Sequence, residues 1–147
     1  MDFSSPTRIP FRVVIKTVDE TLNNNDVLQA DDELKFGVLA NEVWEFQILL
    51  IGDLKVASDI TWSFGVPAGA SMTLLREDYG NWLSQNNALI VRNDVVAAPA
   101  LYEYHNKALY IGGANGGNVQ LYWAQKNAAV EDTVIKAKSY IIGRKLN

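Results

Sequence analysis

Residues that could carry acid–base chemistry are few in this chain, and His105 is its only histidine. A catalytic Ser-His-Asp arrangement needs a serine and an orienting carboxylate within hydrogen-bond reach of the imidazole. The sequence lacks the Gly-x-Ser-x-Gly motif that presents a nucleophilic serine in many hydrolases. Residues 102–107, around the histidine, alternate in a way typical of a strand or turn. We therefore interpret His105 as an ordinary surface or turn histidine.

The densest acidic cluster comprises Asp31, Asp32 and Glu33. A calcium ion would need several oxygens converging at about 2.3–2.6 Å, but adjacent carboxylates at a strand start point in alternating directions. The calcium-loop pattern Asp-x-Asp-x-Asp-Gly is also absent. The sequence therefore favours a charged turn that protects a strand end from unwanted pairing, and it predicts no metal and no cofactor.

Two glycine pairs, at 112–113 and 116–117, fit either a phosphate-binding loop or a turn. Phosphate-binding loops join a strand to a helix, whereas strand signals lie on both sides of this segment and no lysine follows it. Glycine and asparagine supply the positive φ angles that tight turns require. The segment 112–118 therefore predicts a β-hairpin.

Carboxylates and aromatic rings leave two further possibilities open. A sugar-active enzyme would need two carboxylates facing each other across a groove, and no pattern pairs the available acids, Glu42, Glu45, Glu77 and Asp78. We predict no catalytic residues.

Aromatic rings could instead form a carbohydrate platform. Trp44, Trp62 and Trp123 fall on apolar faces at period two, which predicts burial. Tyr79 and Trp82 lie in an irregular segment and are candidates for an exposed surface site, although a loop covering one end of the fold is the simpler interpretation.

The overall composition excludes several classes of protein. The chain has 147 residues, no cysteine and a net charge of −4. The absence of cysteine rules out disulfides and thiolate zinc sites, and the acidic balance argues against nucleic-acid binding. No stretch reaches the roughly 18 apolar residues of a membrane helix, and the N-terminus does not resemble a signal peptide.

The elements that would position these residues are strands. Period-two alternation and turn residues predict strands over 11–18, 33–38, 42–51, 60–66, 71–75, 88–97, 101–111, 119–125 and 133–146. The best helix candidate is a turn over 75–84. The prediction is an all-β, jelly-roll-like β-sandwich of about eight or nine antiparallel strands over residues 11–147, preceded by an extended N-terminal arm over residues 1–10.

Five segments give the chain a resemblance to a known family. They are LQADDELKF at 28–36, ANEVWEF at 40–46, WSFGVPAGA at 62–70, QLYWAQ at 120–125 and SYIIGR at 139–144. Together they resemble the head decoration (auxiliary capsid, or cement) proteins of tailed bacteriophages, including those of thermophilic phages. The resemblance runs from about residue 8 to residue 144 and rests on strand and turn motifs, so it carries no catalytic residues.

That resemblance implies a virion structural protein, made in the host cytoplasm, that sits as a homotrimer on the outer capsid surface and clamps neighbouring major capsid protein subunits. The expected contacts of the arm with capsid or neighbouring subunit are Phe3, Arg8, Ile9 and Pro10. Apolar residues on both faces of two strands make Leu49, Ile51, Tyr140 and Ile142 the candidate trimer contacts. The alternative is a tail-fibre or receptor-binding domain, with an exposed site near Tyr79, Trp82 or the 112–118 loop.

Overall fold

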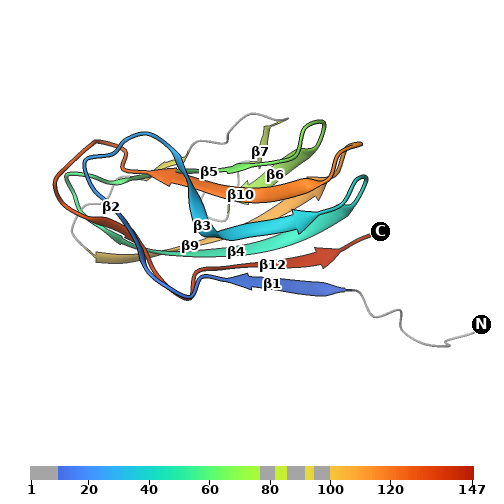
Figure 1. Cartoon of the computed structure of the whole chain (residues 1–147), viewed down its shortest axis with the longest axis horizontal. Coiled ribbons are helices and arrows are strands. Elements are labelled where there is room, and N and C mark those ends of the chain that lie inside the picture. Colours follow the sequence, from blue (N-terminus) through green and yellow to red (C-terminus); the bar gives the residue numbers. More distant parts are fainter. Residues whose placement is uncertain (1–9, 77–81, 86–91, 95–99) are drawn as a thin grey trace, which may run out of the picture.

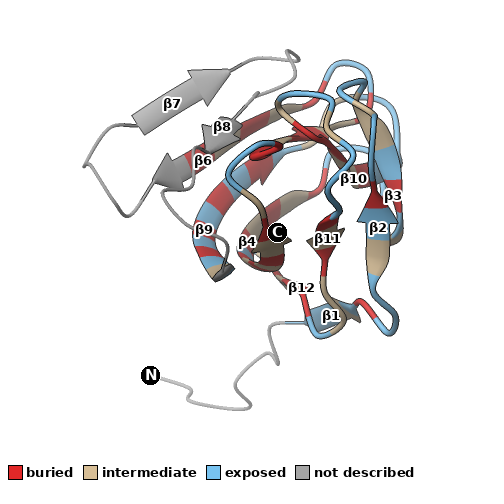
Figure 2. Cartoon of the chain, turned by 90° about the vertical axis from the view of Figure 1, so that its left-hand side faces the viewer, coloured by how far each residue is buried: buried red, intermediate tan, exposed pale blue. Residues whose placement is uncertain are grey.

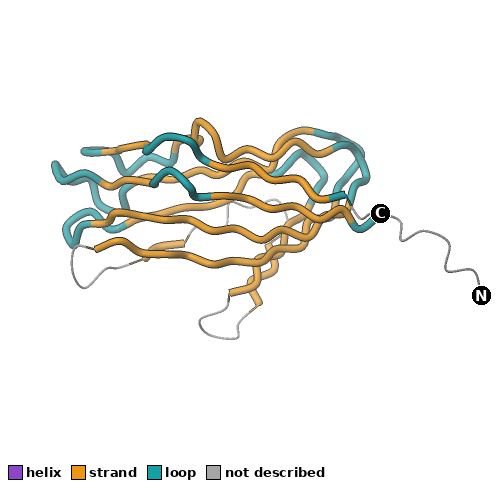
Figure 3. Tube along the Cα trace, turned by 90° about the horizontal axis from the view of Figure 1, so that it is seen from below, coloured by secondary structure: helices purple, strands orange, loops and turns teal. Residues whose placement is uncertain are grey.

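The structure, a computed structural model, describes residues 10–76, 82–85, 92–94 and 100–147, with side chains described over 10–74 and 101–147. Within these ranges the chain forms twelve strands and no helix, and so no helix that could cross a membrane. The strands make two packed antiparallel sheets, and the loops gather at the two ends (Figures 1 and 3). The all-β, jelly-roll-like sandwich predicted from the sequence is confirmed.

The larger sheet has the order β1-β12-β4-β9-β6-β7, with β11 pairing β4 and β2 beside this path. Its strands are β1 (Phe11–Ile15), β2 (Glu20–Leu22), β4 (Val43–Leu54), β6 (Ser71–Arg76), β7 (Trp82–Gln85), β9 (Ala100–Ile111), β11 (Thr133–Ile135) and β12 (Tyr140–Lys145). The smaller sheet has the order β3-β10-β5-β8. Its strands are β3 (Gln29–Val38), β5 (Ile60–Gly65), β8 (Arg92–Asp94) and β10 (Gly117–Ala124).

The core lies between the two sheets and follows the period-two pattern. Side chains alternate across a strand, so the even-numbered residues of β4 point inward while the odd-numbered ones point outward. Figure 2 shows the same alternation as bands along β9. The predicted burial of Trp44, Phe46, Trp62 and Phe64 is confirmed, since each is at most 3% exposed.

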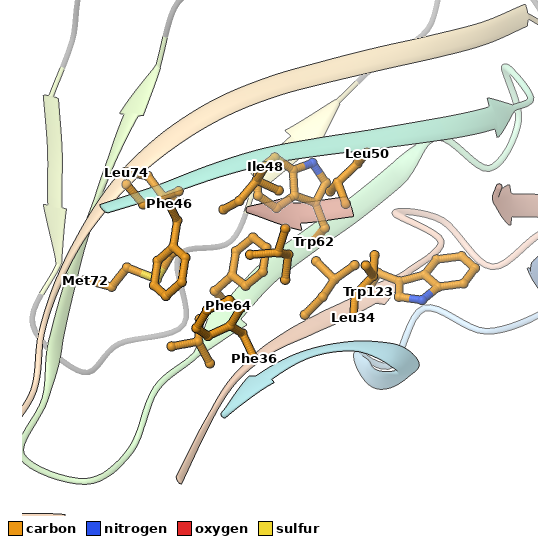
Figure 4. Close-up of a cluster of buried hydrophobic side chains, with 14 of the residues drawn as sticks. Leu34, Phe36, Phe46, Ile48, Leu50, Trp62, Phe64, Met72, Leu74 and Trp123 are labelled. Atoms are coloured by element: carbon orange, nitrogen blue, oxygen red, sulfur yellow. The ribbon is translucent and has the colours of Figure 1, made fainter. Parts of the chain in front are cut away.

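Aromatic rings from both sheets meet in this core (Figure 4). The Phe36 ring of β3 packs edge-to-face against two rings of β4. The distance between ring centres is 5.0 Å to Trp44 and 4.9 Å to Phe46. Edge-to-face pairs of this kind add about 0.5–1.5 kcal/mol beyond the burial of area. The aromatic contacts therefore fasten one sheet to the other.

Three segments differ from the prediction. The closing strand breaks into β11 and β12, which both pair antiparallel with β4, because residues 136–139 bulge out of that pairing, with Lys138 at a φ of 75°. The helix candidate over 75–84 is wrong, since β6 extends to Arg76 and Trp82 begins β7. Asp31 and its acidic neighbours lie inside β3 rather than in a turn. The short strands and this break explain why twelve strands form rather than eight or nine.

The hairpin predicted at 112–118 is also wrong. The segment joins β9 of the larger sheet to β10 of the smaller one, so it crosses between sheets. Glycine is needed there for close backbone approach rather than for a tight turn. A Cβ on Gly112 would lie 2.7 Å from the Glu42 carbonyl oxygen, and one on Gly113 would collide with the Gly69 carbonyl.

Candidate interaction surface

The outward face of the larger sheet collects the four residues predicted as trimer contacts. Register places Tyr140 of β12 beside Leu49 of β4, with Ile142 beside Gln47. Because Ile141, Ile48 and Leu50 point into the core, their neighbours in sequence must point outward. Leu49, Ile51, Tyr140 and Ile142 all lie on this outward face and are half-buried.

The edge strand β1 adds three residues that the sequence reasoning did not single out. Phe11, Val13 and Ile15 are 64%, 53% and 50% exposed, and register sets Val13 beside Ile142 and Ile15 beside Tyr140. The alternation in Phe-Arg-Val-Val-Ile was the signal that could have identified them. We name these seven residues the outer apolar face: Phe11, Val13, Ile15, Leu49, Ile51, Tyr140 and Ile142.

A groove of about 260 Å³ indents one corner of this face. Phe11 and Ile142 supply apolar walls, and the remaining lining residues are Glu45, Gln47 and Arg144. The Arg144 Nη2 atom lies 2.5 Å from Glu45 Oε2. Both of these side chains are more than a third exposed, so the ion pair contributes little, about 0–1 kcal/mol. The groove is thus suited to an apolar side chain flanked by polar backbone.

His105 lies on the outward face, opposite Leu49 in the register of β9 and β4. Its Nε2 atom is 3.4 Å from Glu103 Oε2, and both side chains are more than half exposed. A catalytic histidine needs a buried, oriented partner, which this solvent-exposed pair does not provide. The structure therefore places His105 as a surface histidine in a strand, as interpreted from the sequence.

The acidic cluster is occupied by a lysine rather than arranged for a metal. The Lys16 ammonium lies 2.9 Å from Asp31 Oδ2 and 2.7 Å from Glu20 Oε2, and its side chain is fully buried. The other Asp31 oxygen accepts hydrogen bonds from the Glu33 and Leu34 amides. Among the described residues, no three or more His, Cys, Asp or Glu side chains are grouped so that they could hold a metal ion.

The electrostatics of Lys16 follow from this burial. Desolvation by burial acts to lower its pKa, but the hydrogen bonds and negative charges of Glu20 and Asp31 outweigh that effect and raise the pKa. The ammonium is therefore held charged inside the fold. It ties the end of β1 to the start of β3, which fixes the position of the outer apolar face.

Two further charged residues, Arg12 and Glu42, link the two sheets near the start of β1. The Arg12 guanidinium lies 4.3 Å from the centre of the Phe36 ring and donates a hydrogen bond to the Gly37 carbonyl at 2.8 Å. Buried Glu42 accepts hydrogen bonds from the Leu39 amide and the Trp44 indole, and it pairs with Lys145. Glu42 and Glu45 thus each serve a structural contact, and they do not face each other across a groove.

Several predicted site residues lie outside the described part of the chain. Phe3, Arg8, Ile9 and Tyr79 are among the undescribed residues, and Trp82 belongs to β7, where side chains are not described. Pro10 is described and exposed, and its carbonyl accepts a hydrogen bond from the Lys145 amide at 3.2 Å. The arm contacts therefore stay predictions.

Comparisons with known proteins give only distant similarities. No protein-family model matches the chain, and no curated protein matches it. Solved structures of infectious bursal disease virus strains Gx and Gt align over 100% of the chain at 8% and 11% identity, with TM-scores of 0.36 and 0.31. A mutant VP2 protein of that virus, in derived T=1 particles, aligns over 97% at 12% identity and a TM-score of 0.31. The chain spans 40–42% of those chains. At such low identities and TM-scores these similarities assign no function to the chain.

Proposed function

We propose that the chain is a non-enzymatic virion structural protein of a tailed phage. It decorates the outer surface of the capsid as a homotrimer and clamps neighbouring major capsid protein subunits. The observation that carries this proposal is the outer apolar face, a contiguous surface on three adjacent strands that a free monomer would leave in water.

The size of this face favours a closed ring over a simple pair. Full burial of one aliphatic or aromatic side chain is worth about 1.5–3 kcal/mol. Phe11, Val13 and Ile15 are at least half exposed and the other four residues are less exposed, so the whole face would gain about 3–9 kcal/mol on packing. The association cost is about 4–15 kcal/mol. One contact of this kind is marginal, whereas each copy in a trimer makes two contacts, one with each neighbour.

The arm adds the connection to the capsid. Exposed Pro10 directly precedes Phe11, which belongs to the outer apolar face, and residues 1–9 precede Pro10 in the sequence. Phe3 and Ile9 provide apolar anchors on an otherwise polar segment, and Arg8 provides a charge. Many weak contacts made by three arms at once hold a shell together by avidity. Binding of this kind stabilises the assembled shell by mass action.

Light scattering on the purified chain, followed by binding to empty expanded heads of the encoding phage, tests the proposal. At high dilution we expect three times the chain mass, and we expect saturable binding to expanded heads. Deleting residues 1–9 should keep the thermal unfolding midpoint and weaken head binding by at least about tenfold, because avidity is lost. Phe3→Ala should weaken binding where Ser5→Ala, the matched control in the arm, does not. The proposal would be overturned if the chain were monomeric and did not bind expanded heads.

A further inference from the structure

The edge strand β1 has a free side whose backbone groups can be assigned by parity. The Lys145 amide donates to the Pro10 carbonyl at 3.2 Å, and the Lys16 amide donates to the Ser139 carbonyl at 2.8 Å. In an antiparallel pair the residues that bond to the partner alternate with those that do not. Even-numbered residues of β1 therefore bond to β12. The N–H and C=O groups of Phe11, Val13 and Ile15 point away from it.

Neighbouring edges of the sandwich are protected, in contrast. The Glu33 carboxylate accepts hydrogen bonds from the Thr17 and Val18 amides. These amides, just beyond β1, are therefore not available to pair with another strand. On β3, the edge of the other sheet, Arg12 binds the Gly37 carbonyl and Glu20 binds the Asp32 amide. No described residue makes a comparable contact with the free side of β1. Exposed edges without such protection are templates for adding a strand.

We propose that β1 pairs antiparallel with β1 of a second copy, around a two-fold axis at Val13. In this register Val13 faces Val13 and Phe11 faces Ile15, so the larger sheets of two copies become continuous. Three N–H and three C=O groups on each copy form hydrogen bonds with the other copy.

The occupant is a second copy because the free segment is complementary to itself. Its three outward side chains, Phe11, Val13 and Ile15, are all apolar and at least half exposed. The pairing therefore places apolar side chains of one copy beside apolar side chains of the other. On the inward side, Arg12 faces Val14 and meets no second arginine. A two-fold contact is isologous, whereas the proposed trimer is a ring, so this contact joins copies from different trimers. It stands independently of any capsid role.

The absence of cysteine makes the register directly testable, since each introduced cysteine is the only thiol. Opposing residues in a hydrogen-bonded antiparallel pair have Cα atoms about 5.5 Å apart, within the roughly 4.4–6.8 Å range of a disulfide. Under mild oxidation of the full chain, Val13→Cys should give a disulfide-linked dimer on a non-reducing gel. Phe11→Cys and Ile15→Cys should each stay uncrosslinked alone, and a mixture of these two variants should form the mixed dimer.

A second variant tests the hydrogen bonds. Val13→Pro removes a donor on the free side without removing one that bonds to β12, and proline is tolerated on edge strands. We expect an unchanged circular dichroism spectrum and a more than about tenfold weaker two-fold association by sedimentation equilibrium. The proposal is overturned if Val13→Cys stays monomeric, if all three single-cysteine variants crosslink alike, or if folded Val13→Pro associates normally. If the cysteine variants crosslink in the predicted register but the chain does not bind phage heads, only the proposed capsid role is refuted.

Discussion

Glu42→Gln tests how the sandwich is closed at the end where β1 begins. The Glu42 carboxylate accepts hydrogen bonds from the Leu39 amide at 2.8 Å and from the Trp44 indole N–H at 2.9 Å. Its other oxygen lies 2.8 Å from the Lys145 ammonium. Burial acts to raise the pKa of this carboxyl, but the three donors outweigh burial and lower the pKa from 4.5 to about 2. The charged form is therefore the one that the fold stabilises.

The magnitude follows from that change. A pKa lowered by about 2.5 corresponds to about 3 kcal/mol at about 1.36 kcal/mol per unit. Because the folded pKa is depressed, this stability is present above about pH 4.5 and is lost as the pH falls towards 2. A glutamine keeps an oxygen for Leu39 and Trp44 but carries no charge for Lys145. We expect Glu42→Gln to lower the free energy of unfolding by about 2–3 kcal/mol at pH 7, and by less than about 1 kcal/mol near pH 2.5.

Urea unfolding at pH 7, 4 and 2.5, followed by tryptophan fluorescence, measures this difference. Glu45→Gln is the matched control, because Glu45 and its partner Arg144 are 37% and 38% exposed. The control should change the free energy of unfolding by less than about 1 kcal/mol at every pH. A Glu42→Gln difference that stays constant from pH 7 to pH 2.5 would refute the reasoning, since an effect independent of protonation cannot come from the carboxylate charge.

Three other substitutions test the remaining structural claims. Lys16→Met leaves a buried carboxylate without its cation and should cost about 3–5 kcal/mol in urea unfolding, and a cost under about 1 kcal/mol would contradict the buried ion pair. Gly143→Ala puts a Cβ 2.8 Å from Cε2 of Phe36 and should lower stability by about 1–3 kcal/mol, whereas Gly37→Ala, with its nearest contact at 3.7 Å, should not show this clash. Ile142→Glu places a charge on the outer apolar face and should abolish the trimer in light scattering while the chain stays folded; a persistent trimer would exclude this face from the trimer contact.

The period-two pattern predicted the sandwich because burial on one face leaves a direct trace in the sequence. Along β4, apolar side chains at even positions and polar ones at several odd positions reveal which face is inside. Trp62 and Phe64 repeat the pattern on β5. These local signals need no knowledge of neighbouring strands, so they located the core correctly before any pairing was known.

Features that depend on distant segments left no such trace. Lysine is almost never fully buried, so nothing near residue 16 indicates a cluster with Asp31 fifteen residues away. The glycines at 112–113 look like turn residues, yet they are required by backbone from Glu42 and Gly69. The closing segment looks like one strand because its break depends on distant partners: β11 and β12 both pair with β4, but β11 also pairs with β2 and β12 with β1. Each error concerns a long-range contact rather than a local preference.

One face of β1 packs on the core, and the other face carries the residues that we propose for assembly. Arg12 and the partly buried Val14 point inward, where Arg12 covers the Phe36 ring and Val14 packs against the core. Phe11, Val13 and Ile15 point outward and contribute little to the core, which explains why they are at least half exposed. Because side chains alternate strictly along a strand, a change at an odd position should alter only the proposed contacts between copies, while the even positions keep the strand in place. The same alternation gives the odd residues the free backbone groups, so both the side chains and the hydrogen bonds available for assembly belong to the residues that the fold needs least.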